Sequence, residues 1–195
     1  HARLSLRCAG SGQGDRRAYV VNAAANEIQL YLLSRVTGAL LLANSYPTGA
    51  GPGPLVFNAA GTVAYVPNAG DNTVSVYSVS LATGFLAPLG SPVPTGPNPV
   101  FMTLDPGGTL AYVVNAGDGT VSNYSVNPTT GALTPNGPPV VAADTTEIVV
   151  TPATGIATPY EGNRFALVIN NPSGAVTTKN IQVFSLDTEN GTLAP

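Results

Sequence analysis

Charged side chains are scarce in this sequence. They make up 9% of its 195 residues, against about 25% in an average soluble domain. Arg35 is the only basic residue between Tyr19 and Asn163. Nucleic-acid binding needs a basic surface, so we expect no nucleic-acid partner. The net charge of −3 is mild and indicates no particular partner.

The residue types that most often build catalytic and metal sites are almost missing. The sequence has one histidine, His1, and one cysteine, Cys8. A histidine-based triad or a histidine metal site is therefore not expected within the chain. Cys8 has no second cysteine with which to form an intrachain disulfide. No run of 18 apolar residues is present, so we expect no membrane-spanning segment. We also expect no metal and no cofactor.

A five-residue phrase recurs four times along the chain. Its copies cover residues 18–22, 64–68, 111–115 and 166–170, and each ends in Asn. Tyr19 lies 46 residues before Tyr65, Tyr65 lies 47 before Tyr112, and Tyr112 lies 55 before Leu167. Repeats of about 40–50 residues that are built from strands are typical of β-propeller blades.

Each repeat continues with the same succession of patterns. Apolar and polar residues alternate at 28–32, 74–78, 121–125 and 181–185, which predicts a strand. A turn with glycine follows, because glycine adopts positive φ at little cost. Pro-rich stretches at 45–54, 91–99 and 137–140 then predict the outer edge strand. Short apolar runs at 55–58, 100–104 and 148–150 predict the inner strand that precedes each phrase.

These patterns predict an all-β chain of about four repeats with four antiparallel strands each, a partial or small β-propeller. No segment has a sustained 3.6-residue apolar period, so we expect almost no helix. We expect one domain over residues 1–195, with blades at about 2–49, 52–96, 97–142 and 145–195. Tyr19, Tyr65 and Tyr112 should occupy equivalent positions between adjacent blades, because large aromatic side chains supply the most buried area.

Residues 61–68, 71–77 and 83–86 carry a resemblance to a known family. They read Gly-Thr-Val-Ala-Tyr-Val-Pro-Asn, Asp-Asn-Thr-Val-Ser-Val-Tyr and Thr-Gly-Phe-Leu, and they resemble the YVTN-type repeat. The chain is also similar to the lactonase-like seven-bladed propellers, which include bacterial 6-phosphogluconolactonase. The resemblance implies the propeller fold and, as an activity, the hydrolysis of a sugar lactone. It carries no catalytic motif to numbered positions. Seven such blades need roughly 320 residues.

Polar side chains follow the end of each repeated phrase. Asn22, Asn68, Asn115 and Asn170 close the four copies, and Asp71 and Asp118 lie in two of the turns that follow. In a propeller these turns lie at the same end as the loops that enter the inner strands. These six residues are therefore our candidates for binding a ligand at the central channel. The alternative is structural, because Asn side chains commonly bond the backbone of their own turn. One Asp in each loop is too few for a calcium site.

Two functional classes remain open. The first is an extracytoplasmic propeller that acts as a structural or binding scaffold, which the low charge and the lack of catalytic side chains favour. A surface rich in Asn, Thr, Ser and Gly favours an extracellular or periplasmic location, with the cytoplasm still open. The alternative is a lactonase-like hydrolase that opens a sugar lactone, which only the resemblance supports.

The expected partners are further blades. The sequence stops at residues 191–195, where the outer strand of the fourth blade should begin. Apolar blade faces rarely stay exposed on a monomer. Either four blades close tightly, or a further copy of the same chain completes the ring, or these blades belong to a longer propeller. In the second case, we expect contacts between copies to involve residues 1–10 and 179–195.

Overall fold

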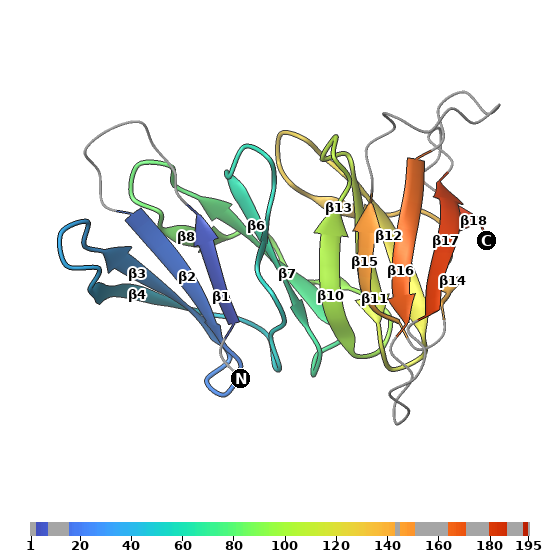
Figure 1. The fold of residues 1–195 in the computed structure, drawn as a ribbon, viewed down its shortest axis with the longest axis horizontal. Coiled ribbons are helices and arrows are strands. Elements are labelled where there is room, and N and C mark those ends of the chain that lie inside the picture. Colours follow the sequence, from blue (N-terminus) through green and yellow to red (C-terminus); the bar gives the residue numbers. More distant parts are fainter. Residues whose placement is uncertain are drawn as a thin grey trace. The chain divides into compact units, whose positions relative to one another are not determined.

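Every regular element that the computed structural model describes is a β-strand (Figure 1). The described residues are 3–7, 16–142, 145–150, 164–170, 180–186 and 193–194, and they contain no helix. The strands form four separate antiparallel sheets, each with four consecutive strands side by side. The prediction of four repeats of four antiparallel strands is therefore confirmed.

The chain divides into two compact units, His1–Val93 and Pro94–Pro195. The first sheet of the first unit contains β1 (Arg3–Arg7), β2 (Arg16–Asn22), β3 (Glu27–Leu33) and β4 (Leu40–Pro47). The second sheet contains β5 (Val56–Phe57), β6 (Val63–Asn68), β7 (Thr73–Val79) and β8 (Leu86–Pro88). The short strand β9 (Val93–Pro94), at the boundary of the units, also pairs with β7.

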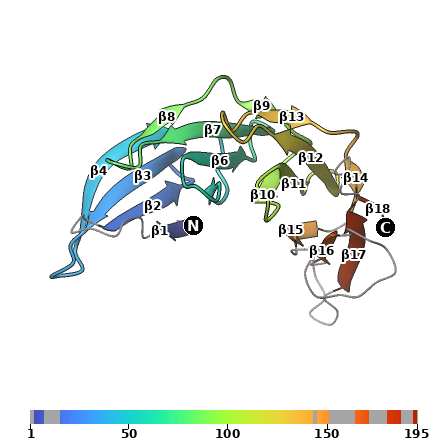
Figure 2. The same cartoon turned by 90° about the horizontal axis from the view of Figure 1, so that it is seen from above.

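The second unit repeats this plan. Its first sheet contains β10 (Pro99–Leu104), β11 (Leu110–Asn115), β12 (Thr120–Val126) and β13 (Leu133–Pro135), and β14 (Val140–Val141) also pairs with β12. Its second sheet contains β15 (Thr145–Val150), β16 (Arg164–Asn170), β17 (Asn180–Leu186) and β18 (Leu193–Ala194). The fourth sheet therefore includes the beginning of an outer strand, which we expected to be missing. Within each sheet, four strands lie side by side in the order in which they occur in the sequence, as Figure 2 shows from above.

The outer strands begin earlier than the sequence predicted. They start directly after the glycine turn, at Leu40, Leu86 and Leu133, and not in the Pro-rich stretches. β4 reaches Pro47 without interruption, whereas the outer strands of the next two sheets are each split into two short pieces. The residues between the pieces include Pro92 in one sheet, and Pro138 and Pro139 in the other. Proline cannot donate to the hydrogen-bond ladder, so these residues divide the outer strand into two pieces.

Glycine is required at the turn between the third and fourth strands. Gly38, Gly84 and Gly131 have φ of 72°, 78° and 72°, a left-handed conformation that other residues rarely adopt. Their amides donate to the carbonyls of Ser34, Ser80 and Asn127 and close the turns. A Cβ added to Gly84 would also lie 2.5 Å from Arg17 Cδ and 3.0 Å from the Tyr19 hydroxyl, so this turn packs against β2.

The core of the first unit lies between its two sheets. Tyr19, Val21, Ile28, Leu30 and Tyr46 of the first sheet form one cluster with Leu55, Ala64, Val66, Tyr77 and Leu86 of the second. The rings of Tyr19 and Phe57 are 5.2 Å apart at 58°, within the range that favours aromatic pairs. The Tyr19 hydroxyl donates to the Gly84 carbonyl at 2.7 Å. Apolar burial and a hydrogen bond therefore both join the first sheet to the second.

The core of the second unit is built in the same way. Tyr112, Val114 and Val121 cluster with Ala142 and Ile148, so the face of one sheet packs against the innermost strand of the next. Tyr65 and Tyr112 are both 0% exposed, and Tyr19 is 3% exposed. All three have the same place in the second strand of their sheet, opposite Leu30, Val76 and Asn123 of the third strand. The predicted equivalence of these tyrosines in register and burial is confirmed.

Candidate functional site

Asn68 holds together three segments of the first unit. Its Nδ2 donates to Thr73 Oγ1 at 3.0 Å and to Ser75 Oγ at 2.9 Å, both on β7. Its Oδ1 accepts the Gly49 N–H at 3.2 Å, from the loop that enters the second sheet. The side chain is 0% exposed. A Cβ on Gly49 would lie 2.7 Å from Asn68 Cγ, so only glycine allows this approach.

Asn115 makes the same two donor contacts in the second unit, but its buried Oδ1 has no hydrogen-bond partner among the described residues. Its Nδ2 donates to Thr120 Oγ1 at 3.0 Å and to Ser122 Oγ at 2.8 Å, and the residue is 0% exposed. A Cβ on Gly96 would lie 2.5 Å from Asn115 Nδ2. The backbones also correspond, because Asn68 pairs with Pro52 and Asn115 with Pro99.

The other two Asn candidates differ from this pair. Asn22 is half-buried, and its Oδ1 accepts the Ala25 N–H at 3.3 Å, a bond within its own turn. Asn170 ends β16, where its backbone pairs with Thr145 and Asn180, and its side chain lies outside the described residues. Asn22 therefore has the structural role described as the alternative to ligand binding, a bond to the backbone of its own turn. Asn68 and Asn115 are structural in another way, because they bond hydroxyls of the next strand.

The two aspartates are exposed at the turns after the second strands. Asp71 Oδ2 accepts the Ala50 N–H at 2.8 Å and so holds the loop before the second sheet. The residue corresponding to Ala50 in the next repeat is Pro97, which has no N–H to give. Asp118 instead accepts from Thr120, with Oδ1 at 3.2 Å from N and 2.8 Å from Oγ1. A ligand role for the six candidates stays a prediction, and only the aspartates among those with described side chains are exposed.

A carboxylate that the sequence reasoning missed lies on the first strand of the last sheet. Glu147 on β15 is exposed, in a chain with few charges, and the next residue, Ile148, is buried in the core. The pairing of β15 with β16 is irregular between Thr145 and Glu147. β-bulges of this kind re-aim side chains and are common next to active sites. A Glu directly before the apolar run at 148–150 was the sequence signal that could have identified it.

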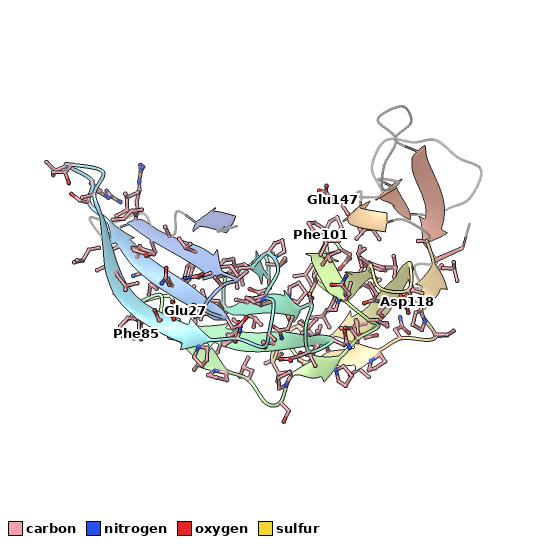
Figure 3. The ribbon with its side chains drawn as sticks, turned by 90° about the horizontal axis from the view of Figure 1, so that it is seen from below. Glu27, Phe85, Phe101, Asp118 and Glu147 are labelled. Carbon is pink, nitrogen blue, oxygen red and sulfur yellow. The ribbon has the colours of Figure 1, made fainter. Side chains whose placement is uncertain are left out.

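Phe101 lies beside Glu147 on the neighbouring strand (Figure 3). β10 has the same irregularity, between Pro99 and Phe101, and Phe101 pairs with Val114 as Glu147 pairs with Ile169. Phe101 is half-buried. β10 and β15 are both the first strand at the edge of their sheets and pack against each other. They bring an exposed carboxylate and a half-buried aromatic ring together within the second unit.

Comparison with known proteins shows where this chain belongs. The family model of lactonases with a seven-bladed β-propeller matches residues 11–151, which is 141 of the 195 residues. The chain belongs to this lactonase family. No curated protein matches it.

Solved structures share the fold of this lactonase-family chain. A protein from Lactobacillus plantarum superimposes with a TM-score of 0.75 at 21% identity, over 92% of this chain and 51% of that one. A proposed 6-phosphogluconolactonase from Bacteroides uniformis gives 0.76 at 18% identity, over 95% and 51%. The periplasmic gluconolactonase of Pseudomonas aeruginosa gives 0.63 at 19%, over 72% and 39%. The chain thus spans about half the length of the first two structures.

In the described residues, no helix is long and apolar enough to cross a membrane.

Proposed function

We propose that the protein containing this chain hydrolyses a sugar lactone. The observation that carries the proposal is the match of the lactonase family to residues 11–151. Two of the structures with the same fold are a proposed 6-phosphogluconolactonase and a periplasmic gluconolactonase. The rival role, a non-catalytic scaffold, has no comparable observation in its favour. It becomes the conclusion if hydrolysis fails.

Glu147 is the side chain best suited to the chemistry. A carboxylate can take a proton from water as a general base, and the resulting hydroxide attacks the carbonyl carbon of the lactone. The ring C–O bond then breaks, and the departing oxygen takes a proton to give the open-chain hydroxy acid. The ring of Phe101, beside Glu147, offers an apolar surface for the C–H face of the sugar ring. No metal or redox partner is required for this balance.

Replacing Glu147 by Gln tests this assignment. The wild-type protein should release acid from glucono-δ-lactone faster than the buffer does, as followed in a pH-stat. Removal of a general base commonly lowers the rate by on the order of a hundredfold or more. We therefore expect kcat to fall by about a hundredfold in Glu147→Gln.

Glu27→Gln is the matched control. Glu27 is another carboxylate on a strand, half-buried where Glu147 is exposed, and it accepts a hydrogen bond from Gln29 at 2.6 Å. Its substitution should leave the rate unchanged. Wild-type hydrolysis no faster than the buffer would reject the lactonase proposal. Normal hydrolysis by Glu147→Gln would reject only the role of Glu147.

We further propose that additional blades complete the propeller, supplied by further copies of this chain or by the remainder of a longer one. The family has seven blades, whereas the described residues form four sheets. The exposure of leucines on the first sheet supports this proposal. Leu86 is 5% exposed because the first sheet covers it, but the corresponding residue of the first sheet, Leu40, is 52% exposed. Leu42 on the same strand is 49% exposed.

Two mass measurements on the natural protein separate these sources. Denaturing mass spectrometry gives the length of the polypeptide, and mass photometry gives the number of copies in the native particle. We expect a polypeptide or a particle clearly larger than the 19.6 kDa of this chain. A stable 19.6 kDa monomer in both experiments would contradict the proposal and favour a closed four-bladed ring.

We also propose an extracytoplasmic location, in the periplasm or outside the cell. The fold is shared with a periplasmic gluconolactonase, and the charged fraction of 9% is low.

A further inference from the structure

A hollow of about 350 Å³ opens in the first unit and is lined by residues of that unit alone. It lies between the end of β4, the turn after β6 and the stretch that separates β8 from β9. Its lining includes Pro47, Asp71, Tyr77, Pro88 and Pro92. The interruption of the outer strand by proline therefore leaves a space where the first sheet has the continuous strand β4.

The hollow offers few hydrogen-bond donors. Its three proline rings are apolar and carry no N–H. The Tyr77 hydroxyl donates to the Pro47 carbonyl at 2.7 Å, and Thr48 Oγ1 donates to the Gly49 carbonyl at 2.9 Å. The Gly49 N–H donates to Asn68. A phosphate or a carboxylate would therefore find these three donors already used. Ser75 and Gly90 are the other lining residues that could supply a donor.

A negatively charged hydrogen-bond acceptor, the carboxylate of Asp71, lines the hollow. Asp71 is exposed, and its Oδ2 accepts one hydrogen bond, from the Ala50 N–H. A carboxylate has about four lone-pair sites, so it can accept more bonds. No Lys or Arg is among the residues that line the hollow. The basic residue nearest to Asp71 along the chain, Arg35, is 36 residues away.

We propose that this hollow binds a primary alkylammonium group, such as the side chain of a lysine that a partner protein presents. An ammonium group has three donors and no acceptor, which complements a lining that is rich in acceptors and poor in donors. An aliphatic stem complements the proline walls, as lysine stems commonly cover apolar surfaces.

The same lining recurs one repeat later, in the second unit. All the residues that line the hollow, except Val76, have the same residue type 47 positions further on. The Tyr124 hydroxyl donates to the Pro94 carbonyl at 2.7 Å, and Thr95 Oγ1 donates to the Gly96 carbonyl at 2.9 Å. These two donors are therefore used in the same way, and Asp118 stands at the position of Asp71, where its Oδ1 accepts from Thr120. We expect a second ammonium site of the same kind at Asp118.

Titration with Nα-acetyl-lysine methylamide, monitored by amide NMR of the protein, tests the proposal. The resonances of Val76, Tyr77 and Gly90 should shift with saturation. Nα-acetyl-norleucine methylamide, which has an aliphatic chain without the charge, should shift them much less. Asp71→Asn should weaken lysine binding by about fivefold, the upper range for an exposed ion pair, and added salt should weaken it in the wild type.

Two variants keep the result interpretable. Asp71→Asn retains an oxygen that can accept the Ala50 N–H, so its melting temperature should stay close to that of the wild type. Asp118→Asn should weaken the shifts at Asn123 and Tyr124 and leave those at Val76 and Tyr77 unchanged. Equal binding of the lysine and norleucine derivatives, or no saturable shift with either, would overturn the proposal. So would lysine binding that Asp71→Asn and Asp118→Asn leave unaltered.

Discussion

Tyr65→Ala should lower the free energy of unfolding by about 3–5 kcal/mol, the usual cost of deleting a buried aromatic ring. Tyr65 is 0% exposed in the middle of β6. The variant leaves a cavity that the flanking strands cannot close, because both are held in register by the ladder. A urea titration with linear extrapolation measures the loss. Tyr31→Ala is the control, since Tyr31 is only half-buried, and a loss below about 1 kcal/mol at Tyr65 would show that the ring does not support the core.

Tyr65→Phe removes the hydroxyl and keeps the ring. The effect of the hydroxyl is measured as the dependence of the free energy of unfolding on pH. Burial raises the pKa of Tyr65 to about 12, whereas an unfolded tyrosine ionises near 10. Below pH 10 both states keep the proton, so the stability is fully present. Between pH 10 and about 12 only the unfolded state loses the proton, and stability should fall by about 1 kcal/mol per pH unit. Burial also raises the pKa of Tyr77 and Tyr124, so they add to the fall. The decline should be shallower in Tyr65→Phe, and an identical decline would contradict this account.

Period and alternation were sufficient to predict the second and third strands of each sheet. β6, β7, β11 and β12 lie where the repeated phrase and the alternating segment predicted them, because one face of each strand must be apolar to pack against a neighbouring sheet. The outer strands were placed too late. Their first residues, such as Leu86 and Leu133, pair with the ends of β7 and β12. This pairing follows from the geometry of the glycine turn. The prediction instead placed the start of each outer strand in the Pro-rich stretch that follows.

The roles of the Asn residues depended on contacts that spacing alone did not reveal. Asn68 and Asn115 bond the hydroxyls five and seven residues further on. Alternation places Thr73 and Ser75 on one face of β7, and the tight turn brings that face opposite the end of β6. The pattern of Asn, then Thr at the fifth and Ser at the seventh position, occurs in both repeats. It was therefore available in the sequence, but we considered only bonds within the turn and bonds to a ligand.

Asn68→Ala should lower the free energy of unfolding by about 3 kcal/mol. The variant removes three hydrogen bonds and leaves the Gly49 N–H and the Ser75 hydroxyl without the partner they have now. Each buried polar group that loses its partner costs about 1–3 kcal/mol. The loop that enters the second sheet also loses its attachment to β6. Amide hydrogen exchange should therefore show faster exchange at Gly49 together with the lower stability in urea.

Asn22→Ala is the matched control for this substitution. Asn22 closes the first copy of the same phrase, but it is half-buried and bonds only the Ala25 N–H, at 3.3 Å, among the bonds observed in its turn. Its loss should cost less than about 1 kcal/mol. Equal losses in Asn22→Ala and Asn68→Ala would contradict the view that Asn68 joins β6, β7 and the entering loop. In that case, the asparagine at the end of the phrase would act through its own turn in every repeat, and the hydroxyls of Thr73 and Ser75 would be incidental partners.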